Sequence, residues 1–160
     1  MSTFSAELPA DLWPRWIARS AALLNSHRDL TGRELIARGG SAEEEAERLL
    51  AAPFVVVSHG TEADPVLNYG NRVALALWEM SAEQLLATPS RLTAEPMLRE
   101  ERERLLEQAA RDGFFMGYEG VRISATGRRF RISNATVWNV TDAAGRPAGQ
   151  AATFARWTFL

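Results

Sequence analysis

The chain has 160 residues and a mass of 17.7 kDa, the size of one ordinary domain with an appended element. Hydrophobic residues make up 46% and charged residues 24% of the sequence, which argues against a disordered tail, a fibre or a membrane protein. The formal net charge of -2 predicts no strong field toward nucleic acid or an anionic membrane, so we expect neither as a partner.

Two residue types are missing from the sequence. There is no cysteine, and all 18 cationic side chains are arginine. This composition excludes a thiol nucleophile, a cysteinyl-flavin adduct, thiolate zinc and iron-sulfur sites, a Schiff-base lysine and a P-loop lysine. Only His27 and His59 remain for metal, haem or general-base chemistry.

No targeting or membrane segment is predicted. Charged residues and prolines such as Asp11, Pro14 and Arg15 interrupt the apolar run that a signal peptide needs. No uncharged stretch approaches the roughly 18 residues of a membrane helix, so we expect a cytoplasmic protein.

The first 52 residues are predicted to form a helical extension. Apolar residues recur at helical spacing on a first helix, and His27 lies late on it, where we expect a surface residue or one at the C-terminal end of the helix. Residues 35–36, followed by two glycines, predict a short helix and its end. Ser41 and Glu44 have the spacing of a capping box for a further helix, which Pro53 ends.

The pattern changes after this extension, so we place a second unit at 53–160. A β-branched run at 54–57 and the segment 66–69 predict a hairpin, and Asn71 can cap a short helix that carries Trp78. Ser81 and Gln84 form a second capping box, and residues 93–112 predict the longest helix of this unit. Strands are expected over 114–124, 129–140 and 150–160.

Polar groups interrupt the apolar face of the middle strand. Phe130, Ile132 and Trp138 share one parity of an alternating pattern, and Asn134 and Thr136 fall between them. Buried polar groups need hydrogen-bond partners, so these two predict either a pocket lining or an internal network. A bulge would place them outside instead. Along the preceding strand, Glu119 raises the same question.

This order of elements resembles the PAS fold over 53–160. The residues that carry the resemblance are the stretch from Tyr69 to Trp78, in which an asparagine caps a helix that ends in an aromatic residue, the segment 81–89 and the acidic-glycine turn at 142–149. The resemblance implies an α+β fold, a PAS-like five-stranded antiparallel sheet with short helices on one face, preceded by the N-terminal helical extension. We expect the first helices to cover the outer face of the sheet or to form a dimer contact.

The whole chain is similar to the stand-alone bacterial branch of the MEKHLA domain family, a relative of PAS domains. The stretches that carry this similarity are PFVVVSHG at 53–60, NYGN at 68–71, PSRLTAEP at 89–96, GYEGVRIS at 117–124 and VWN at 137–139. The sequence has neither a homeodomain, nor zipper heptads, nor the string that names the family, so the DNA binding of its plant members does not carry over.

The resemblance implies a sensory or regulatory module that holds a small ligand between sheet and helices and signals through protein contacts, as a homodimer or with a partner protein. Its ligand is unknown. Haem is not expected, because the predicted helix over 93–112 contains no histidine. The candidate pocket-lining residues are His59, Asn68, Tyr69, Asn71, Trp78, Glu119, Asn134, Thr136 and Trp138.

Each candidate has a structural alternative, such as hydrogen bonding at a strand end for His59, helix capping for Asn71 and core packing for Trp78. Two other functions stay open. One is a ligand-free dimerisation module, and the other is a small cone-shaped α+β isomerase or dehydratase. Such an enzyme needs a buried carboxylate as its base, and Glu119 is the best placed acid. No catalytic constellation or metal site is evident, so we do not expect an enzyme.

Overall fold

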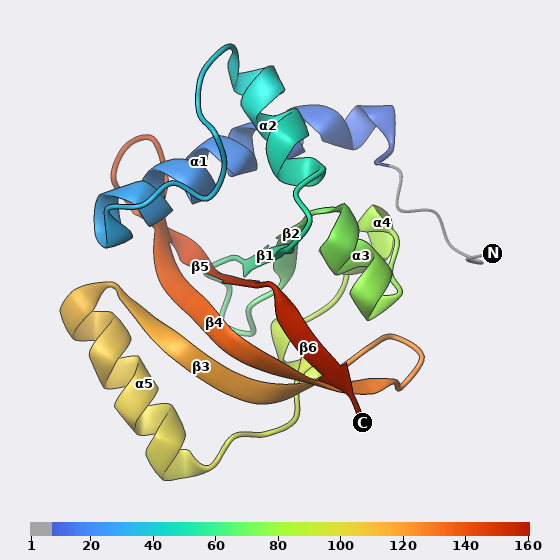
Figure 1. The fold of residues 1–160 in the computed structure, drawn as a ribbon, viewed down its shortest axis with the longest axis vertical. Coiled ribbons are helices and arrows are strands. Elements are labelled where there is room, and N and C mark those ends of the chain that lie inside the picture. Colours follow the sequence, from blue (N-terminus) through green and yellow to red (C-terminus); the bar gives the residue numbers. More distant parts are fainter. Residues whose placement is uncertain (1–7) are drawn as a thin grey trace.

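The computed structural model describes residues 8–160, which form one antiparallel sheet with helices on both of its faces (Figure 1). The helices are η1 (Ala10–Leu12), α1 (Trp13–Thr31), α2 (Ala42–Leu50), α3 (Arg72–Trp78), α4 (Ala82–Leu86), η2 (Ser90–Thr93) and α5 (Arg99–Asp112). The strands are β1 (Val55–His59), β2 (Leu67–Gly70), β3 (Phe114–Ile123), β4 (Arg129–Thr141), β5 (Pro147–Phe154) and β6 (Arg156–Phe159).

The strands lie in the order β2-β1-β5-β4-β3, and every pairing between them is antiparallel. This confirms the predicted α+β class and the five-stranded sheet. The sixth strand arises because the last strand, expected to run unbroken over 150–160, is interrupted at Ala155. The short β6 therefore pairs with the first half of β4, beside the end of β5.

Strand β4 changes the faces of its side chains at Asn134, whose φ of 52° lies in the left-handed region. Asparagine tolerates this region better than most residues do. Before the kink Ile132 faces the α5 side of the sheet, and after it Val137 takes over that face while Trp138 faces α1. The simple alternation expected from the sequence is therefore wrong, and the bulge describes the strand.

Helix α1 covers one face of the sheet, and Figure 1 shows the strands between α1 and α5. The indole nitrogen of Trp16 donates to the carbonyl of Gly70 at 2.9 Å inside this interface. His27 lies edge-on to the ring of Trp138, with 4.9 Å between ring centroids, and is only 7% exposed. His27 lies near the C-terminal end of α1, as one of the two expectations has it, but it is not a surface residue, because this end of α1 packs on β4 rather than projecting into solvent.

The local signals for helix starts are confirmed. Ser41 and Glu44 exchange side-chain and backbone hydrogen bonds in a capping box, as do Ser81 and Gln84. The Asn71 side chain accepts a hydrogen bond from the first turn of α3. These caps form because each uses groups within one turn of chain.

Two predicted helices differ from the structure. Residues 33–40 form a loop instead of a short helix, and Arg38 anchors this loop by an ion pair of 2.7 Å with Glu45. Helix α5 begins at Arg99 rather than at residue 93. Ahead of it the chain is extended, and the Glu95 amide donates to Val121 on the edge of β3. The proline at 96 favours this extended backbone at the residue before it.

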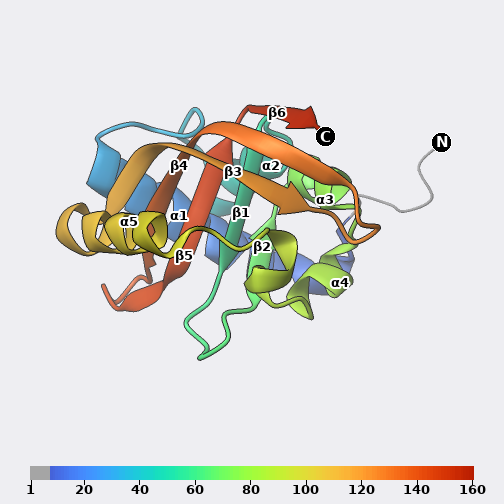
Figure 2. The same cartoon turned by 90° about the horizontal axis from the view of Figure 1, so that it is seen from below.

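The predicted boundary at residue 52 stays a prediction. The buried core is continuous across it, because Leu23 and Leu24 of α1 belong to the same hydrophobic cluster as Val55 and Val56 of β1. Figure 2 shows the molecule from below, with α5 in front of the strands and α1 behind them.

Candidate functional site

A cavity of about 310 Å³ lies between the sheet and the helices of the α5 side. Its floor is a row of side chains that cross the sheet, since Val57, Ala152, Val137 and Phe115 are successive register partners on β1, β5, β4 and β3. Its opposite wall is also mainly apolar and comes from α3, η2, the extended segment that follows η2, and α5, with Trp78, Thr93, Met97, Leu105 and Leu106. Pockets of this size and lining are typical small-molecule sites.

One end of the cavity is polar. His59 pairs with Gln150 in the sheet, and Gln150 pairs with Asn139, so the three lie in one row on the cavity face. The Gln150 amide donates to Asn139 Oδ1 at 3.3 Å, and the Asn139 amide donates to the carbonyl of Ala109 on α5 at 3.1 Å. The His59 ring bonds through Nδ1 to the Gly60 carbonyl, which leaves Nε2 for another partner. This row ties the sheet to α5 and presents polar groups to a ligand.

The other end of the cavity carries Tyr118 and charged groups. Tyr118, Gly120 and Arg122 share the cavity face of β3, opposite Ala135, Ile132 and Phe130. The Tyr118 hydroxyl lies so close over Gly120 that a Cβ there would collide with it. The Arg122 guanidinium lies 5.4 Å from the centre of the Tyr118 ring, which is a cation–π arrangement. A residue without a side chain at 120 is therefore what lets this aromatic-arginine pair form.

Two of the nine residues predicted from the sequence line this cavity, His59 and Trp78. Trp78 is buried, and its indole nitrogen donates to the Thr93 carbonyl at 3.3 Å, so the ring closes the cavity from the helical side. The sequence did not indicate Gln150, Arg102, Arg122 or Tyr118 as lining residues. The shared parity of residues 118, 120 and 122 is the signal that could have indicated this face of β3.

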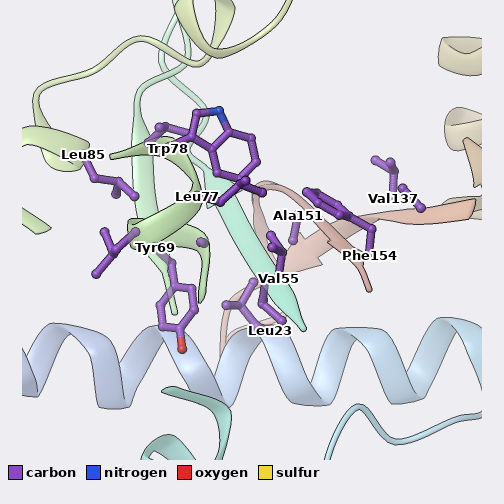
Figure 3. Packing of buried hydrophobic residues seen from close by; sticks show 14 of the residues in the cluster. Leu23, Val55, Tyr69, Leu77, Trp78, Leu85, Val137, Ala151 and Phe154 are labelled. Carbon is purple, nitrogen blue, oxygen red and sulfur yellow. The ribbon is translucent and has the colours of Figure 1, made fainter. Parts of the chain in front are cut away.

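Asn68 and Tyr69 do not line the cavity. Asn68 accepts a hydrogen bond from Ser58 at 2.6 Å. Tyr69 points toward α1, away from Trp78 (Figure 3), and its ring packs on Trp16 with 5.6 Å between centroids. Burial raises the pKa of the Tyr69 hydroxyl above its ordinary value, an effect that the hydroxyl of Ser20 opposes. Both residues therefore belong to the interface between the sheet and α1.

Asn71 is fully buried and its side chain is saturated by the protein. Its Oδ1 accepts from the amides of Val56 and Ala74, both at 3.1 Å, and its Nδ2 donates to the carbonyl of Phe54 at 2.7 Å. A further bond reaches the Leu49 carbonyl at 3.3 Å. The residue joins α2, β1 and α3, which is the structural alternative noted from the sequence.

The remaining candidates lie outside the cavity. Glu119 is exposed and lines a second pocket with Glu101 and Arg131. Asn134 is exposed because of its left-handed backbone, and the kink turns Thr136 and Trp138 to the α1 face. Within residues 8–160 the buried Trp138 Nε1 has no hydrogen-bond partner. The expected inward direction of these groups failed because it assumed an unbroken alternation along β3 and β4.

Comparison with known proteins relates this architecture to a protein family and to solved structures. The family model of the MEKHLA domain matches residues 17–159. Among solved structures, a PAS domain from Colwellia psychrerythraea aligns with a TM-score of 0.57 and 13% identity, covering 74% of this chain and 95% of that one. No curated protein matches the sequence significantly.

Two further structures show the same fold. The light-state dimer of the fungal blue-light photoreceptor Vivid aligns with a TM-score of 0.52 and 13% identity, covering 81% of this chain and 89% of that one. A PAS domain of a LuxR-family transcriptional regulator from Burkholderia thailandensis, solved with ethanol, aligns with a TM-score of 0.52 and 18% identity, covering 71% and 95%. With a family match over nearly its whole length and a PAS-like sheet, the chain belongs to the MEKHLA domain family.

Proposed function

We propose that this protein is a sensory or regulatory module that binds a small molecule in the cavity between the sheet and α5 and reports its presence through protein contacts. The observation that carries the proposal is the cavity of about 310 Å³, with an apolar floor and polar groups at both ends. An apolar space of this volume with a few polar groups is the usual form of a small-molecule site.

The structural relatives support this use of the fold. One of them is a PAS domain in complex with ethanol, and another is a light-oxygen-voltage domain studied with a flavin analogue. This chain has no cysteine, so it cannot form a cysteinyl-flavin adduct, and α5 has no histidine to ligate haem. A ligand held by packing and hydrogen bonds fits the residues that are present.

The cavity wall offers a route for the signal. Helix α5 presents Leu105 to the cavity and a charged face to solvent, so a ligand that shifts this helix changes the protein surface. The protein that binds this altered surface is a second copy of the chain or a partner protein, as the dimer of the fungal relative illustrates. No helix in the described part of the chain is long and apolar enough to cross a membrane.

The enzymatic alternative has less support, because Glu95, a carboxylate that does line the cavity, is paired with Arg129. Glu119 is exposed and outside the main cavity, whereas the chemistry would need a carboxylate in an apolar setting. Across residues 8–160 no group of three or more His, Asp or Glu side chains is arranged to hold a metal ion.

Native mass spectrometry and absorption spectroscopy of the freshly purified protein test the proposal, together with a thermal-shift screen of small molecules. We expect a bound mass or a stabilising ligand. Ala152 lies at the centre of the cavity floor, so Ala152→Phe should abolish binding, whereas Ala110→Phe on the exposed face of α5 should retain it. Ala152→Leu is the smaller change to use if the first variant does not fold.

The outcomes separate the alternatives. Equal binding by wild type and Ala152→Phe would overturn the cavity as the site. A dimer with no bound mass and no response to any small molecule would favour the ligand-free dimerisation module. Turnover that depends on Glu119 would revive the enzyme.

A further inference from the structure

The charges around the cavity do not balance within the protein. Three fully charged side chains line it, Glu95, Arg102 and Arg122. Glu95 is already paired with Arg129, at 2.5 Å between nitrogen and oxygen. Among residues 8–160, neither Arg102 nor Arg122 forms an ion pair with a carboxylate. The cavity lining therefore holds two arginines without a carboxylate partner, of which Arg102 is exposed and Arg122 is partly buried.

Arg122 is placed for a ligand rather than for solvent. It is partly buried and lies on the cavity face of β3, where Phe130 is its register partner on β4. Its guanidinium rests against the Tyr118 ring, and this contact holds the group in place without using its N–H donors. The planar group can then donate two parallel hydrogen bonds to a carboxylate. The Tyr118 hydroxyl, held over Gly120, is a further donor at the same end.

The rest of the cavity selects an apolar body. Phe115, Leu105 and Phe154 face the same space, and the floor is formed by alanine and valine. Such a lining disfavours a ligand with several charges, because each would lose hydration without a partner.

We propose that the natural ligand is a small organic acid, with its apolar part in the cavity and its carboxylate on Arg122, assisted by Arg102 and the Tyr118 hydroxyl. This inference rests on the proposed function, since it names the chemical class of the ligand in the same cavity. The site lies at the end of the cavity opposite the row of His59, Gln150 and Asn139.

Matched probes test the acid directly. Octanoate and phenylbutyrate are compared with their primary amides by calorimetry and thermal shift on the full chain. The acids should bind at least about tenfold tighter than the amides, because a charge-assisted hydrogen bond is worth more than a neutral one. Arg122→Gln should weaken acid binding about tenfold and leave amide binding unchanged. Arg156→Gln, an exposed arginine on β6 outside the cavity lining, should change neither.

The controls keep this inference distinct from the proposed function. Amide binding by Arg122→Gln reports an intact cavity, and the wild-type ratio of acid to amide affinity tests the idea even if that variant does not fold. Equal affinity for acids and amides would overturn the organic acid and leave small-molecule binding standing. If neither acid nor amide binds, but a chemically different molecule binds the wild type and not Ala152→Phe, the organic acid is overturned and small-molecule binding in the cavity stands. If no small molecule binds at all, both proposals are overturned.

Discussion

Arg19 Nη2 donates a hydrogen bond to the carbonyl oxygen of His59 at 3.2 Å, so the last residue of β1 presents its imidazole to the cavity and its backbone to α1. The same guanidinium donates to the Ala148 carbonyl at 2.8 Å and to Ser58 Oγ at 3.1 Å. Burial lowers the pKa of Arg19 to about 10, against the opposing charge of Glu62. One side chain of α1 thus joins β1 to β5 beside the polar end of the cavity.

Replacing Arg19 should loosen this end of the sheet. Arg19→Met leaves two carbonyls without their donors, so we expect the free energy of unfolding to fall by about 1–3 kcal/mol. Urea denaturation measures the loss. Arg15→Met, one turn earlier on the exposed side of α1, is the matched control and should change stability by less than about 0.5 kcal/mol. Equal effects of the two variants would show that the Arg19 contacts add no stability.

The close approach of β5 to the end of β1 requires a glycine at position 149. Its φ of 107° is unfavourable for other residues, and a Cβ would collide with the carbonyl oxygen of His59. Gly149→Ala should therefore cost at least about 2 kcal/mol of unfolding free energy. Gly145→Ala tests positive φ alone, because that position at 77° has open space around it, and its cost should be about 1 kcal/mol. A cost for Gly149→Ala no larger than for Gly145→Ala would contradict the predicted collision.

Asn71 should be intolerant of even an isosteric change. Asn71→Asp keeps the acceptor but loses the donors to Phe54 and Leu49 and introduces a buried carboxylate, so we expect a loss of about 2–4 kcal/mol. Thermal and urea unfolding measure it. Asn25→Asp on exposed α1 keeps its role as acceptor for Arg38 and should be close to neutral. A neutral Asn71→Asp would contradict the donor role of the amide.

His27 should make stability depend on pH. Burial lowers the pKa of His27 from its ordinary value of 6.5, although the Arg33 carbonyl and the charge of Glu34 act in the opposite sense. The unfolded chain then takes up this proton at higher pH than the folded protein. The contribution of the neutral ring to stability is complete above the unfolded pKa and declines as the pH falls below it.

We expect the unfolding free energy of the wild type to fall between about pH 7.5 and pH 5.5, with a slope from this one proton of at most about 1.4 kcal/mol per pH unit. His27→Gln should reduce stability at pH 7.5 and flatten the slope in this window. The carboxylates whose pKa is lowered, such as Glu44 and Asp142, lose their contribution at lower pH. An undiminished slope in His27→Gln would assign the pH dependence to another group.

The sequence was sufficient for the elements whose causes are local. The capping boxes at Ser41 and Ser81 and the cap at Asn71 form within a single turn, so the spacing of a few neighbouring residues is enough to recognise them. The five-stranded antiparallel sheet followed from the resemblance to PAS domains, which itself rested on the order of strands, helices and turns. His59 at the end of β1, one of the candidates from the sequence, lines the cavity, and its contact with a ligand stays a prediction.

The sequence by itself determined the capped helix starts and most of the strands, because caps, turns and alternation act over a few residues, whereas the loop at 33–40, the start of α5 and the break at Ala155 depend on tertiary contacts. Only the tertiary structure decided which side chains reach the cavity. One left-handed residue, Asn134, exchanges the faces of the side chains along β4. Tyr69 and Trp138 pack against α1 on the opposite side of the sheet. The alternation of apolar residues in a sequence does not reveal where a bulge lies. A single left-handed residue at the centre of a strand therefore moves every side chain beyond it to the opposite face of the sheet from the one expected.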